Sequence, residues 1–554
     1  MDYRPAKLAR FLLGPSSGYA GIRWLFLRAL ALVYFSAFFS LIFQIRGLIG
    51  PHGIFPAGRY LQEVGKAFGW LRFWFAPTIL WAGSGNRALD LLCWLGLAAS
   101  ILALLNFWPR LSFFVCLALY LSFIAAAQSF ADYQSDGMLL AAGLLALFFS
   151  PPGIWPGWAV DHPPSRASLY LLRWEWFRIY FESGVAKLAG GDPEWRHLTA
   201  LYDYYQNGPL PTWIAWYAEQ LPHWFQRAAA GFTLATELGL VWLLFAPRRF
   251  RIGLFFLVSA FQIGIILTGN YAFLNYLVLS LGLLLLDDRF LARLRLLPRK
   301  LVERQRTRAA VATQSPAVEP VSLRLTPDTA EPDASRSSPA ESTAGRPPWR
   351  RALATARLWL AGIIFGWIFY ATTALLVAAL LPLPLWPASV LGPFRFANEY
   401  GLFGVMTRGQ YQIEFQGSYN GKSWIAYPFL YKPQNPAKAP GIYAPYQPRF
   451  DWNLWFASQE PWQEAPIVLR TEVLLLRNDP AVLSLFAGNP FAAKPPLEVR
   501  AVLWQYWFTD PATRRATGDW WRRKLIGLYA PALMREPRGR PIVVQMPRAG
   551  VMGH

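Results

Sequence analysis

Charged residues and cysteines are both scarce in this chain of 554 residues. Asp, Glu, Lys and Arg make up 15% of the sequence, whereas a soluble protein averages about 25%. The two cysteines, Cys93 and Cys116, both lie in long apolar stretches. A disulfide framework that would hold the water-exposed regions together is therefore excluded.

Sequence motifs of several chemistries are missing as well. No zinc-ligand spacing, phosphate-binding loop or Ser/His/Asp order rises above chance. An RNP motif or a basic recognition helix is also absent, which argues against a nucleic-acid partner despite the basic composition. We therefore expect no metal, no cofactor and no nucleic acid.

Long hydrophobic runs, in contrast, are abundant. Hydrophobic residues make up 54% of the chain and the mean hydropathy is +0.24. A membrane-spanning helix needs about 20 mostly apolar residues. The sequence therefore predicts a polytopic α-helical membrane protein with about nine transmembrane helices, at Trp24–Phe43, Ala88–Phe107, Leu111–Phe130, Asp136–Phe149, Tyr170–Leu188, Phe225–Phe245, Phe250–Leu267, Tyr271–Leu286 and Leu358–Leu381.

The net charge of +21 is concentrated next to these segments. Basic residues favour the cytoplasmic ends of membrane spans. They cluster at the N-terminus, at Arg110, at Arg248–Arg251 and around residues 289–308, which all fall on one side if nine spans hold. The first loop, about 44–87, is the exception because it also carries Arg46, Arg59, Lys66 and Arg72.

The chain divides into four predicted parts. Residues 1–296 form the membrane domain with eight spans, 297–349 a disordered cytoplasmic linker rich in Ala, Ser, Pro and Thr, 350–385 the ninth span, and 394–554 a non-cytoplasmic β-containing domain. In the last part, alternation from Tyr411 predicts a strand, and Asn420-Gly421 favours a type I′ turn leading to a second strand at 425–431. Glu498–Phe508 predicts a further strand, and 451–458 and 478–486 predict short helices.

The helix at 170–188 is unusual because it carries Arg173, Glu175, Arg178, Glu182 and Lys187. An ionised side chain at the bilayer centre costs about 2.5–3.5 kcal/mol even on a lenient scale. Glu175, Arg178 and Glu182 are spaced by three and four residues, so they form one stripe and can pair along the helix. We expect this stripe to face other helices or a wet cavity, which makes it a candidate site.

Several polar and aromatic residues near this helix allow two interpretations. Asp192 before Pro193 is typical of a helix N-cap. Asp203, among Tyr202, Tyr204 and Tyr205, could bind a cation or a partner, or it could belong to a buried hydrogen-bonded cluster. Trp452, Trp455 and Phe456 share a helix face that is either core or a binding face for protein or lipid.

These motifs together resemble the lipase maturation factor family, and the resemblance covers most of the chain except the linker. The family's animal members are membrane proteins of the endoplasmic reticulum that help secreted lipases reach their active form. The resemblance rests on Phe177-Arg-Ile-Tyr-Phe-Glu-Ser-Gly-Val-Ala-Lys-Leu, Gly190-Gly-Asp-Pro-Glu-Trp-Arg-His-Leu-Thr-Ala-Leu, Leu267-Thr-Gly-Asn-Tyr-Ala-Phe-Leu-Asn, Tyr400-Gly-Leu-Phe-Gly-Val-Met-Thr and Tyr443-Ala-Pro-Tyr-Gln-Pro-Arg-Phe-Asp-Trp-Asn-Leu-Trp-Phe-Ala.

A weaker resemblance links Gly184-Val-Ala-Lys187-Leu188 to the vitamin K-dependent carboxylase superfamily, in which such a helix carries a catalytic lysine. A desolvated lysine can act as a base. In that interpretation Lys187 is the base of an integral membrane enzyme, with His52, Asp136 and Glu182 near it. The alternative interpretations are a lysine that snorkels at the end of its span and a histidine that caps a turn.

The leading hypothesis is a membrane-bound maturation or folding factor for exported proteins, with lipases as clients if the family role carries over. It catalyses no reaction, and its partners are the client and membrane lipid. The membrane is that of the endoplasmic reticulum by family, or the cytoplasmic (inner) membrane in a bacterium. The alternatives are the Lys187 enzyme and a transporter, against which the lack of inverted repeats counts. The residues expected to bind the client are Asp192, Trp195, Arg196, Tyr202, Asp203, Trp452 and Trp455.

Overall fold

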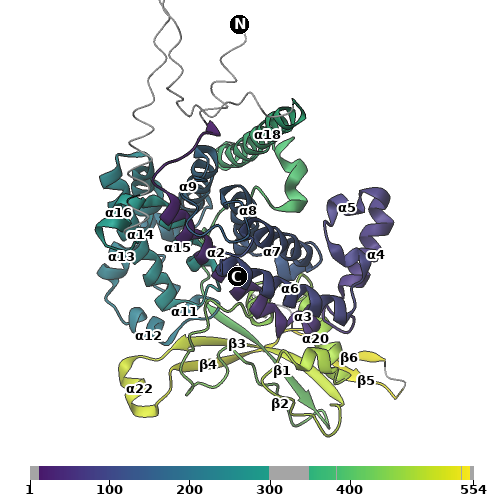
Figure 1. The fold of residues 1–554 in the computed structure, drawn as a ribbon. Helices are drawn as coiled ribbons and strands as arrows, with labels where there is room; N and C mark the ends of the chain where they lie inside the picture. Colours follow the sequence, from purple (N-terminus) through teal and green to yellow (C-terminus); the bar gives the residue numbers. More distant parts are fainter. Residues whose placement is uncertain (1–11, 299–302, 304–347, 382–383, 538–539, 549–554) are drawn as a thin grey trace, which may run out of the picture.

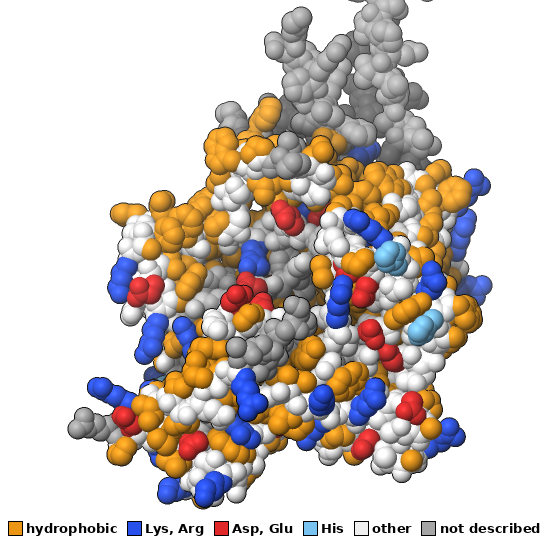
Figure 2. Space-filling model, turned by 180° about the vertical axis from the view of Figure 1, so that it is seen from behind, with side chains coloured by type: hydrophobic (Ala, Val, Ile, Leu, Met, Phe, Trp, Pro, Cys, Tyr) orange, Lys and Arg blue, Asp and Glu red, His pale blue; other side chains and the backbone are white. Residues whose placement is uncertain are grey.

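The computed structural model describes residues 12–298, 303, 348–381, 384–537 and 540–548. A bundle of helices stands on one face of an antiparallel sheet (Figure 1). The predicted linker, 297–349, lies almost wholly outside the described residues. Charged side chains are frequent on the half that holds the sheet, and hydrophobic side chains cover much of the half that holds the helices (Figure 2).

All nine predicted membrane segments are helical in the described part of the chain. Their positions agree with the apolar runs because a backbone in lipid must satisfy its hydrogen bonds internally. The helices are α2 (Ala20–Ile42), α6 (Asn86–Leu104), α7 (Pro109–Ile124), α8 (Gln134–Phe149), α9 (Arg166–Ala189), α13 (His223–Leu234) continued by η4 (Ala235–Gly239) and η5 (Leu240–Phe245), α14 (Arg248–Thr268), α15 (Leu274–Gly282) with η6 (Leu283–Leu285), and α18 (Pro348–Ala378).

Five of these helices are long and apolar enough to cross a membrane: α2, α6, the run from His223 to Phe245, α14 and the part of α18 from Trp359. Helices α7, α8 and the run from Leu274 to Leu285 are apolar but shorter. Helix α9 has 24 residues but carries the charged stripe. The chain is thus a polytopic helical membrane protein, and the count of nine crossings stays a prediction.

Small residues let the helices approach closely, as is typical of membrane bundles. A Cβ atom at Gly96 of α6 would lie 2.3 Å from the ring of Phe38 on α2, and one at Gly143 of α8 would lie 2.0 Å from the Tyr34 hydroxyl. That hydroxyl donates to Leu139 O of α8 at 3.1 Å. Cys93 and Cys116 are buried and free inside α6 and α7, as the sequence predicts.

The loop between α2 and α6 contains helices that the sequence did not predict. They are α3 (Ile45–Ile49), α4 (Ala57–Phe68), η1 (Gly69–Leu71), α5 (Arg72–Phe75) and η2 (Ile79–Ala82). Figure 1 shows α4 and α5 beside the bundle, away from the sheet. Because α4 has a polar face and an apolar face, it lacks the long apolar run by which the membrane helices are recognised.

Shorter helices join the main elements. They are η3 (Gln128–Ala131), α10 (Pro193–His197), α11 (Tyr204–Asn207), α12 (Trp213–Glu219), α16 (Asp288–Arg293) and η8 (Ala388–Phe394). The predicted helix start at Asp192 is confirmed, because its carboxylate caps α10 by accepting from the Glu194 amide at 3.0 Å.

The C-terminal part forms a six-stranded antiparallel sheet in the order β2-β1-β3-β5-β6, with β4 also paired to β3. Its helices α19 and α20 pack on one face of the sheet, where Ile413, Phe415 and Leu503 are fully buried. The strands are β1 (Gln410–Ser418), β2 (Ile425–Ala426), β3 (Glu498–Phe508), β4 (Trp521–Leu528), β5 (Ala532–Arg535) and β6 (Pro541–Gln545), and the helices are α19 (Arg449–Ala457), α20 (Pro466–Leu476), α21 (Pro480–Leu483) and α22 (Pro511–Thr517).

The predicted type I′ turn at Asn420-Gly421 is wrong. A type I′ turn needs positive φ at both central residues, but of these two only Gly421 has one, at +70°. The Asn420 carboxamide instead accepts from the amides of Lys422 and Ser423, both at 2.9 Å, which widens the loop. The returning strand is also shorter than predicted, because β2 ends at Ala426, before Pro428, which has no amide hydrogen to donate.

Candidate functional site

The charged stripe of α9 is buried inside the protein, as predicted. Arg178 lies between two carboxylates, with NH1 3.2 Å from Glu175 Oε2 and Nε 2.7 Å from Glu182 Oε1. The three side chains are between 0% and 4% exposed. Arg173, on another part of the helix, donates to Leu284 O at 2.7 Å. The stripe therefore neutralises most of its own charge and does not face lipid.

The stripe also holds the chain that leads into the sheet, which we call the connecting segment (residues 395–408). The Tyr400 amide donates to Glu182 Oε2 at 3.0 Å, and the Tyr400 hydroxyl donates to Glu175. The Arg178 guanidinium donates to the carbonyl oxygen of Asn398. All three charged residues thus contact one short stretch of backbone and one tyrosine.

Lys187, one turn further along α9, is fully occupied by acceptors. Its Nζ atom lies 3.0 Å from Oε1 of Glu237, 2.7 Å from Leu402 O and 3.5 Å from Ser183 O. An ammonium group has three protons to donate, so these three acceptors use all of them. The side chain is 2% exposed and lies over the Trp195 ring at 5.1 Å.

The partner of Lys187 sits on an unusual backbone. Glu237 belongs to η4, a π-helical turn within the helix from His223 to Phe245. Such turns often occur where a helix places a functional side chain. Gly184 of α9 permits the contact, because a Cβ atom there would lie 2.9 Å from Glu237 Cβ and from Leu238.

The chain after α9 closes over the other side of the connecting segment. The second oxygen of Asp192 accepts from the Met406 amide at 2.7 Å, and the indole of Trp195 donates to Phe403 O at 2.9 Å. Asn207 donates to Thr407 O at 2.8 Å. The connecting segment is thus held between α9 and residues 190–208.

A second buried ion pair joins the bundle to α19. The Arg449 guanidinium donates to both oxygens of Asp136 on α8, each at 2.8 Å, and to the Tyr120 hydroxyl at 2.9 Å. The Tyr120 hydroxyl in turn donates to Asp136 at 2.6 Å. Both charged side chains are at most 1% exposed. This bidentate arrangement is the strongest form of a charged hydrogen bond.

Neutral side chains form a third junction at residues 441–447. Ser40 of α2 accepts from the Gln447 amide at 3.0 Å, and Gln44, just before α3, donates to the Gln447 carbonyl oxygen at 2.9 Å. Asn270, between α14 and α15, donates to Gly441 O at 2.9 Å and accepts from the Tyr443 amide at 2.6 Å. The polar turn at Thr268–Asn270 therefore contacts the C-terminal part. The loops at Asp132 and His52 contact it as well, through Arg395 and Asp479.

The residues proposed for the enzyme do not form one group. Lys187 and Glu182 both contact the connecting segment, but they have different partners there. Asp136 is paired with Arg449. The His52 side chain is 75% exposed and lies 3.7 Å from Asp479 of α21. These four residues therefore have separate surroundings, and a catalytic role for them stays a prediction.

The residues proposed for client binding divide into buried and accessible ones. Arg196 and Asp203 are exposed, and Tyr202 is half-buried and stacks on His223 at 4.1 Å between ring centroids. The other four, Asp192, Trp195, Trp452 and Trp455, are buried. Trp455, for example, donates to the Gln410 carboxamide at 3.0 Å.

Sequence reasoning missed Glu237, Tyr400 and Arg449. Glu237 gave a signal, because a lone acidic residue within an apolar span needs a cation, and Lys187 ends another span. Tyr400 and Arg449 gave none, because their partners are 225 and 313 residues away in the sequence. Pairing over such distances is visible only in the folded protein.

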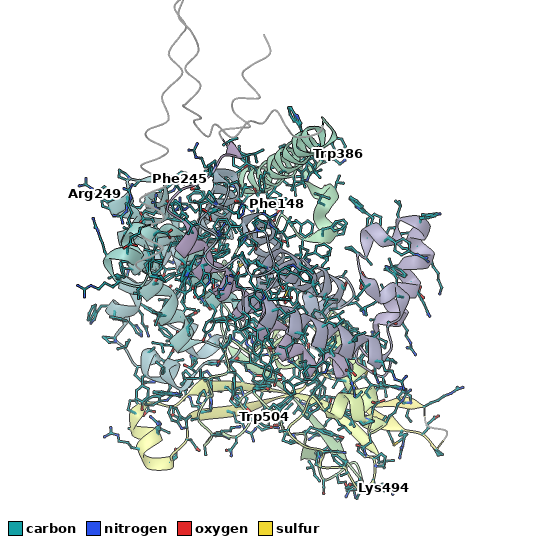
Figure 3. All side chains as sticks on the ribbon, viewed as in Figure 1. Phe148, Phe245, Arg249, Trp386, Lys494 and Trp504 are labelled. Atoms are coloured by element: carbon teal, nitrogen blue, oxygen red, sulfur yellow. The ribbon has the colours of Figure 1, made fainter. Side chains whose placement is uncertain are left out.

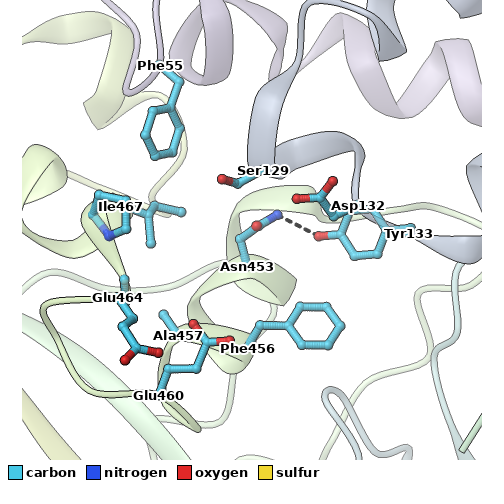
Figure 4. Close-up of a pocket in the computed structure, with 12 residues that line it drawn as sticks. Phe55, Ser129, Asp132, Tyr133, Asn453, Phe456, Ala457, Glu460, Glu464 and Ile467 are labelled. Atoms are coloured by element: carbon cyan, nitrogen blue, oxygen red, sulfur yellow. Dashed lines mark hydrogen bonds between the residues drawn. The ribbon is translucent and has the colours of Figure 1, made fainter. Parts of the chain in front are cut away.

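A cavity of about 260 Å³ lies where the bundle meets α19 and α20 (Figure 4). Burial raises the pKa of Asp132, and Arg395 at 3.5 Å opposes this. Burial and the negative charge of Glu464 raise the pKa of Glu460. The lining includes Phe55, Ser129, Asp132, Tyr133, Asn453, Phe456, Glu460, Glu464 and Ile467. It is an acidic recess, but no group of three or more metal-binding side chains converges anywhere among the described residues.

Residues 21–293 match the family model of the lipase maturation factor transmembrane domain, and residues 396–531 match that of the lipase maturation factor C-terminal domain. Lipase maturation factor 2 of Gallus gallus is 34% identical over 583 residues, which cover 92% of this chain and 81% of that protein. Lipase maturation factor 2 of Homo sapiens is 32% identical, with 92% and 82% covered. Lipase maturation factor 1 of Bos taurus is 31% identical, with 93% and 90% covered. No solved structure matches the chain. The chain therefore belongs to the lipase maturation factor family.

Proposed function

We propose that this protein is a membrane-bound maturation factor that binds exported client proteins, lipases among them, and catalyses no reaction on them. The names of its relatives support the lipase client. The observation that carries the proposal is that the intramembrane charges around the connecting segment bind this chain's own backbone. The bundle then acts as a rigid mount that presents the C-terminal sheet.

The surroundings of Lys187 favour this proposal over the enzyme. A general base needs a free lone pair within reach of its substrate. Lys187 donates to three acceptors and is 2% exposed, which supports a structural role for its side chain, out of reach of a substrate. The membrane enzyme with Lys187 as base remains the second candidate, on the family resemblance of this helix alone.

The client surface that we propose lies outside the buried junctions. Arg196, Tyr202 and Asp203 lie on the stretch after α9 and are at least partly accessible. These three residues, rather than the buried Asp192, Trp195, Trp452 and Trp455, are the candidates for direct contact. The sheet and these residues lie at the same end of the bundle, so one client could contact both.

We further propose that this end is the non-cytoplasmic one, in the endoplasmic reticulum membrane or in a bacterial inner membrane. Arg249, in the basic first turn of α14, lies at the end of the bundle remote from Trp504 and Lys494 of the sheet region (Figure 3). Basic loops favour the cytoplasmic side. A client that has crossed the membrane would then meet the sheet directly.

Lys187→Arg tests the choice between the two candidate functions. Arginine keeps the charge and can donate to Glu237 and Leu402, but its pKa above 12 prevents it from acting as a base. We expect secretion of active client to be largely retained in cells that express Lys187→Arg as their sole copy. Deletion of residues 394–554 should abolish client co-purification.

A second variant at position 187 separates loss of the lysine's charge from loss of a base. Lys187→Met removes the charge and strands Glu237, so it should lower the folded yield, whereas Lys187→Arg should not. A Lys187→Arg protein with normal yield and normal melting but no client activity would overturn the proposal in favour of the enzyme.

A further inference from the structure

The part of the first loop that contains α4 and α5, residues 57–82, exposes an unusual amount of apolar surface. We call it the α4–α5 hairpin. Trp70 is 89% exposed, and Leu71 and Ile79 are 60% and 54% exposed. Phe68, Phe73, Trp74 and Phe75 are each 38–47% exposed. A contiguous apolar patch of this kind marks a site that another apolar phase covers.

Among the described residues, the hairpin is bonded to α7 and η8 and not to the strands of the sheet. Thr78 donates to Ser122 O of α7 at 2.9 Å, and the Trp74 indole donates to Val390 O in η8 at 3.1 Å. Figure 1 shows α4 and α5 at the height of α6 to α8. The patch therefore lies level with the membrane helices.

The depth of the hairpin is limited by its length. Ser122 lies two residues before Ile124, where α7 ends on the side of the sheet. Helix α4 has 12 residues, which span about 18 Å, and the hydrocarbon core is about 30 Å thick. The hairpin thus reaches into the leaflet on the sheet side but cannot cross the bilayer.

Its charges suit the boundary between headgroups and acyl chains. The Arg72 guanidinium lies over the rings of Phe73 and Trp81, at 4.7 and 5.0 Å. Lys66 pairs with Glu63 at 2.9 Å on the polar face of α4, where both are more than 70% exposed. Aromatic rings next to basic residues are typical of helices that lie in a membrane interface.

We propose that the α4–α5 hairpin is an interfacial anchor whose aromatic end is inserted among the lipids of the sheet-side leaflet. Bilayer lipid is favoured as the occupant because the patch continues the surface of α6 and α7, which expose Trp94 and Phe114 by 57% and 56%. Burial in lipid also explains why the first loop departs from the charge alternation. Arg72 lies on aromatic rings, and Lys66 with its partner Glu63 would lie among headgroups and not in an aqueous loop.

Spin labelling in liposomes tests this proposal. A nitroxide at Trp70→Cys should collide more often with oxygen, which concentrates in lipid, than with a water-soluble nickel complex. Glu63→Cys, on the polar face of the same helix, should show the opposite order. Val543→Cys on β6 is the second control, because Val543 is 54% exposed and apolar but lies on the sheet.

The cysteine substitutions should report the position of the hairpin without disturbing the fold. Trp70 is so exposed that its replacement should leave the fold intact, and Phe75→Cys provides a second reporter at the same end. Cys93 and Cys116 are buried, so the unsubstituted protein should take up almost no label. If the label at Trp70→Cys follows the order of Val543→Cys, the hairpin stands in water and the proposal is overturned. This result does not depend on which client the protein binds.

Discussion

Replacement of Arg178 by alanine measures how strongly the bundle depends on the charged stripe of α9. The guanidinium is 0% exposed and lies between Glu175 and Glu182, which are 4% and 1% exposed. Arg178→Ala leaves two carboxylates buried without a cation and removes the donor to Asn398 O. Breaking a buried pair in this way costs about 3–5 kcal/mol, so we expect the folded yield to fall sharply and the melting temperature in detergent to drop.

The assay separates a local defect from a general one. Purified protein is heated in detergent while tryptophan fluorescence and protease cleavage near residues 395–408 are followed. Cleavage should rise in Arg178→Ala at temperatures where the bundle still gives a folded signal, because the connecting segment loses the hydrogen bond that holds Asn398 O. Arg196→Ala is the matched control, since that exposed guanidinium donates to Leu188 O alone at 2.8–3.3 Å.

Removing all three charges of the stripe together should restore the stability that Arg178→Ala loses. Glu175→Gln with Arg178→Met and Glu182→Gln removes all three charges at once, so no ion is left unpaired. Replacing a buried ion cluster by neutral groups is often neutral or stabilising, and the triple variant should melt above Arg178→Ala. Equal melting of Arg178→Ala and Arg196→Ala would refute the reasoning, because it would mean that water reaches the stripe.

Three further predictions concern the Asp136–Arg449 pair, a buried carboxyl group of α20 and the sidedness of the chain. Asp136→Asn should destabilise the protein by about 3–5 kcal/mol because it leaves Arg449 as an unpaired buried cation, and Asp136→Leu combined with Arg449→Met should melt higher than the single variant in the same thermal assay. Glu472 of α20 is fully buried, and burial raises the pKa of its carboxyl group well above the usual value. As pH rises, Glu472 therefore loses its carboxyl proton in the unfolded chain before it does so in the folded protein, and the stability of the fold should fall above about pH 4.3. The gain in melting temperature of Glu472→Gln over the unsubstituted protein should grow from pH 5 to pH 8. A gain that does not change with pH would contradict this prediction. A protease-cleavable tag at Ser337 should be accessible from the cytoplasm and one at His554 from the opposite side; accessibility from the same side would exclude an odd number of crossings between them.

The sequence predicts the elements whose pattern is local. Nine apolar runs coincide with nine helices in the described residues because length and hydropathy alone specify a helix in lipid. Alternation places β1, and Glu498–Phe508 coincides with β3. Spacing along one helix likewise predicts that Glu175, Arg178 and Glu182 pair, since their separations are fixed by helical geometry.

The same reasoning fails where the determining contact is remote. The sequence around Asp136 does not predict that Arg449 is its partner, and the sequence around Glu175 does not predict Tyr400. The turn at Asn420 was mispredicted because its side chain caps the loop, which competes with the backbone conformation that the dipeptide favours. Strand β4 was missed because Arg522, Arg523 and Lys524 leave its first half exposed and without alternation.

The membrane part pairs some of its buried charges by itself and leaves others for the C-terminal part to pair. Lys187 and Glu237 neutralise each other within the first 296 residues, and Arg178 neutralises one of its two neighbouring carboxylates. One excess negative charge remains on the charged stripe of α9, and the donors that meet it are the amide and hydroxyl of Tyr400 in the connecting segment. Asp136 likewise lacks a cation until Arg449 arrives. Docking of residues 395–449 thus satisfies two acidic groups that the bundle cannot satisfy by itself, which gives the bundle a strong preference for the docked domain.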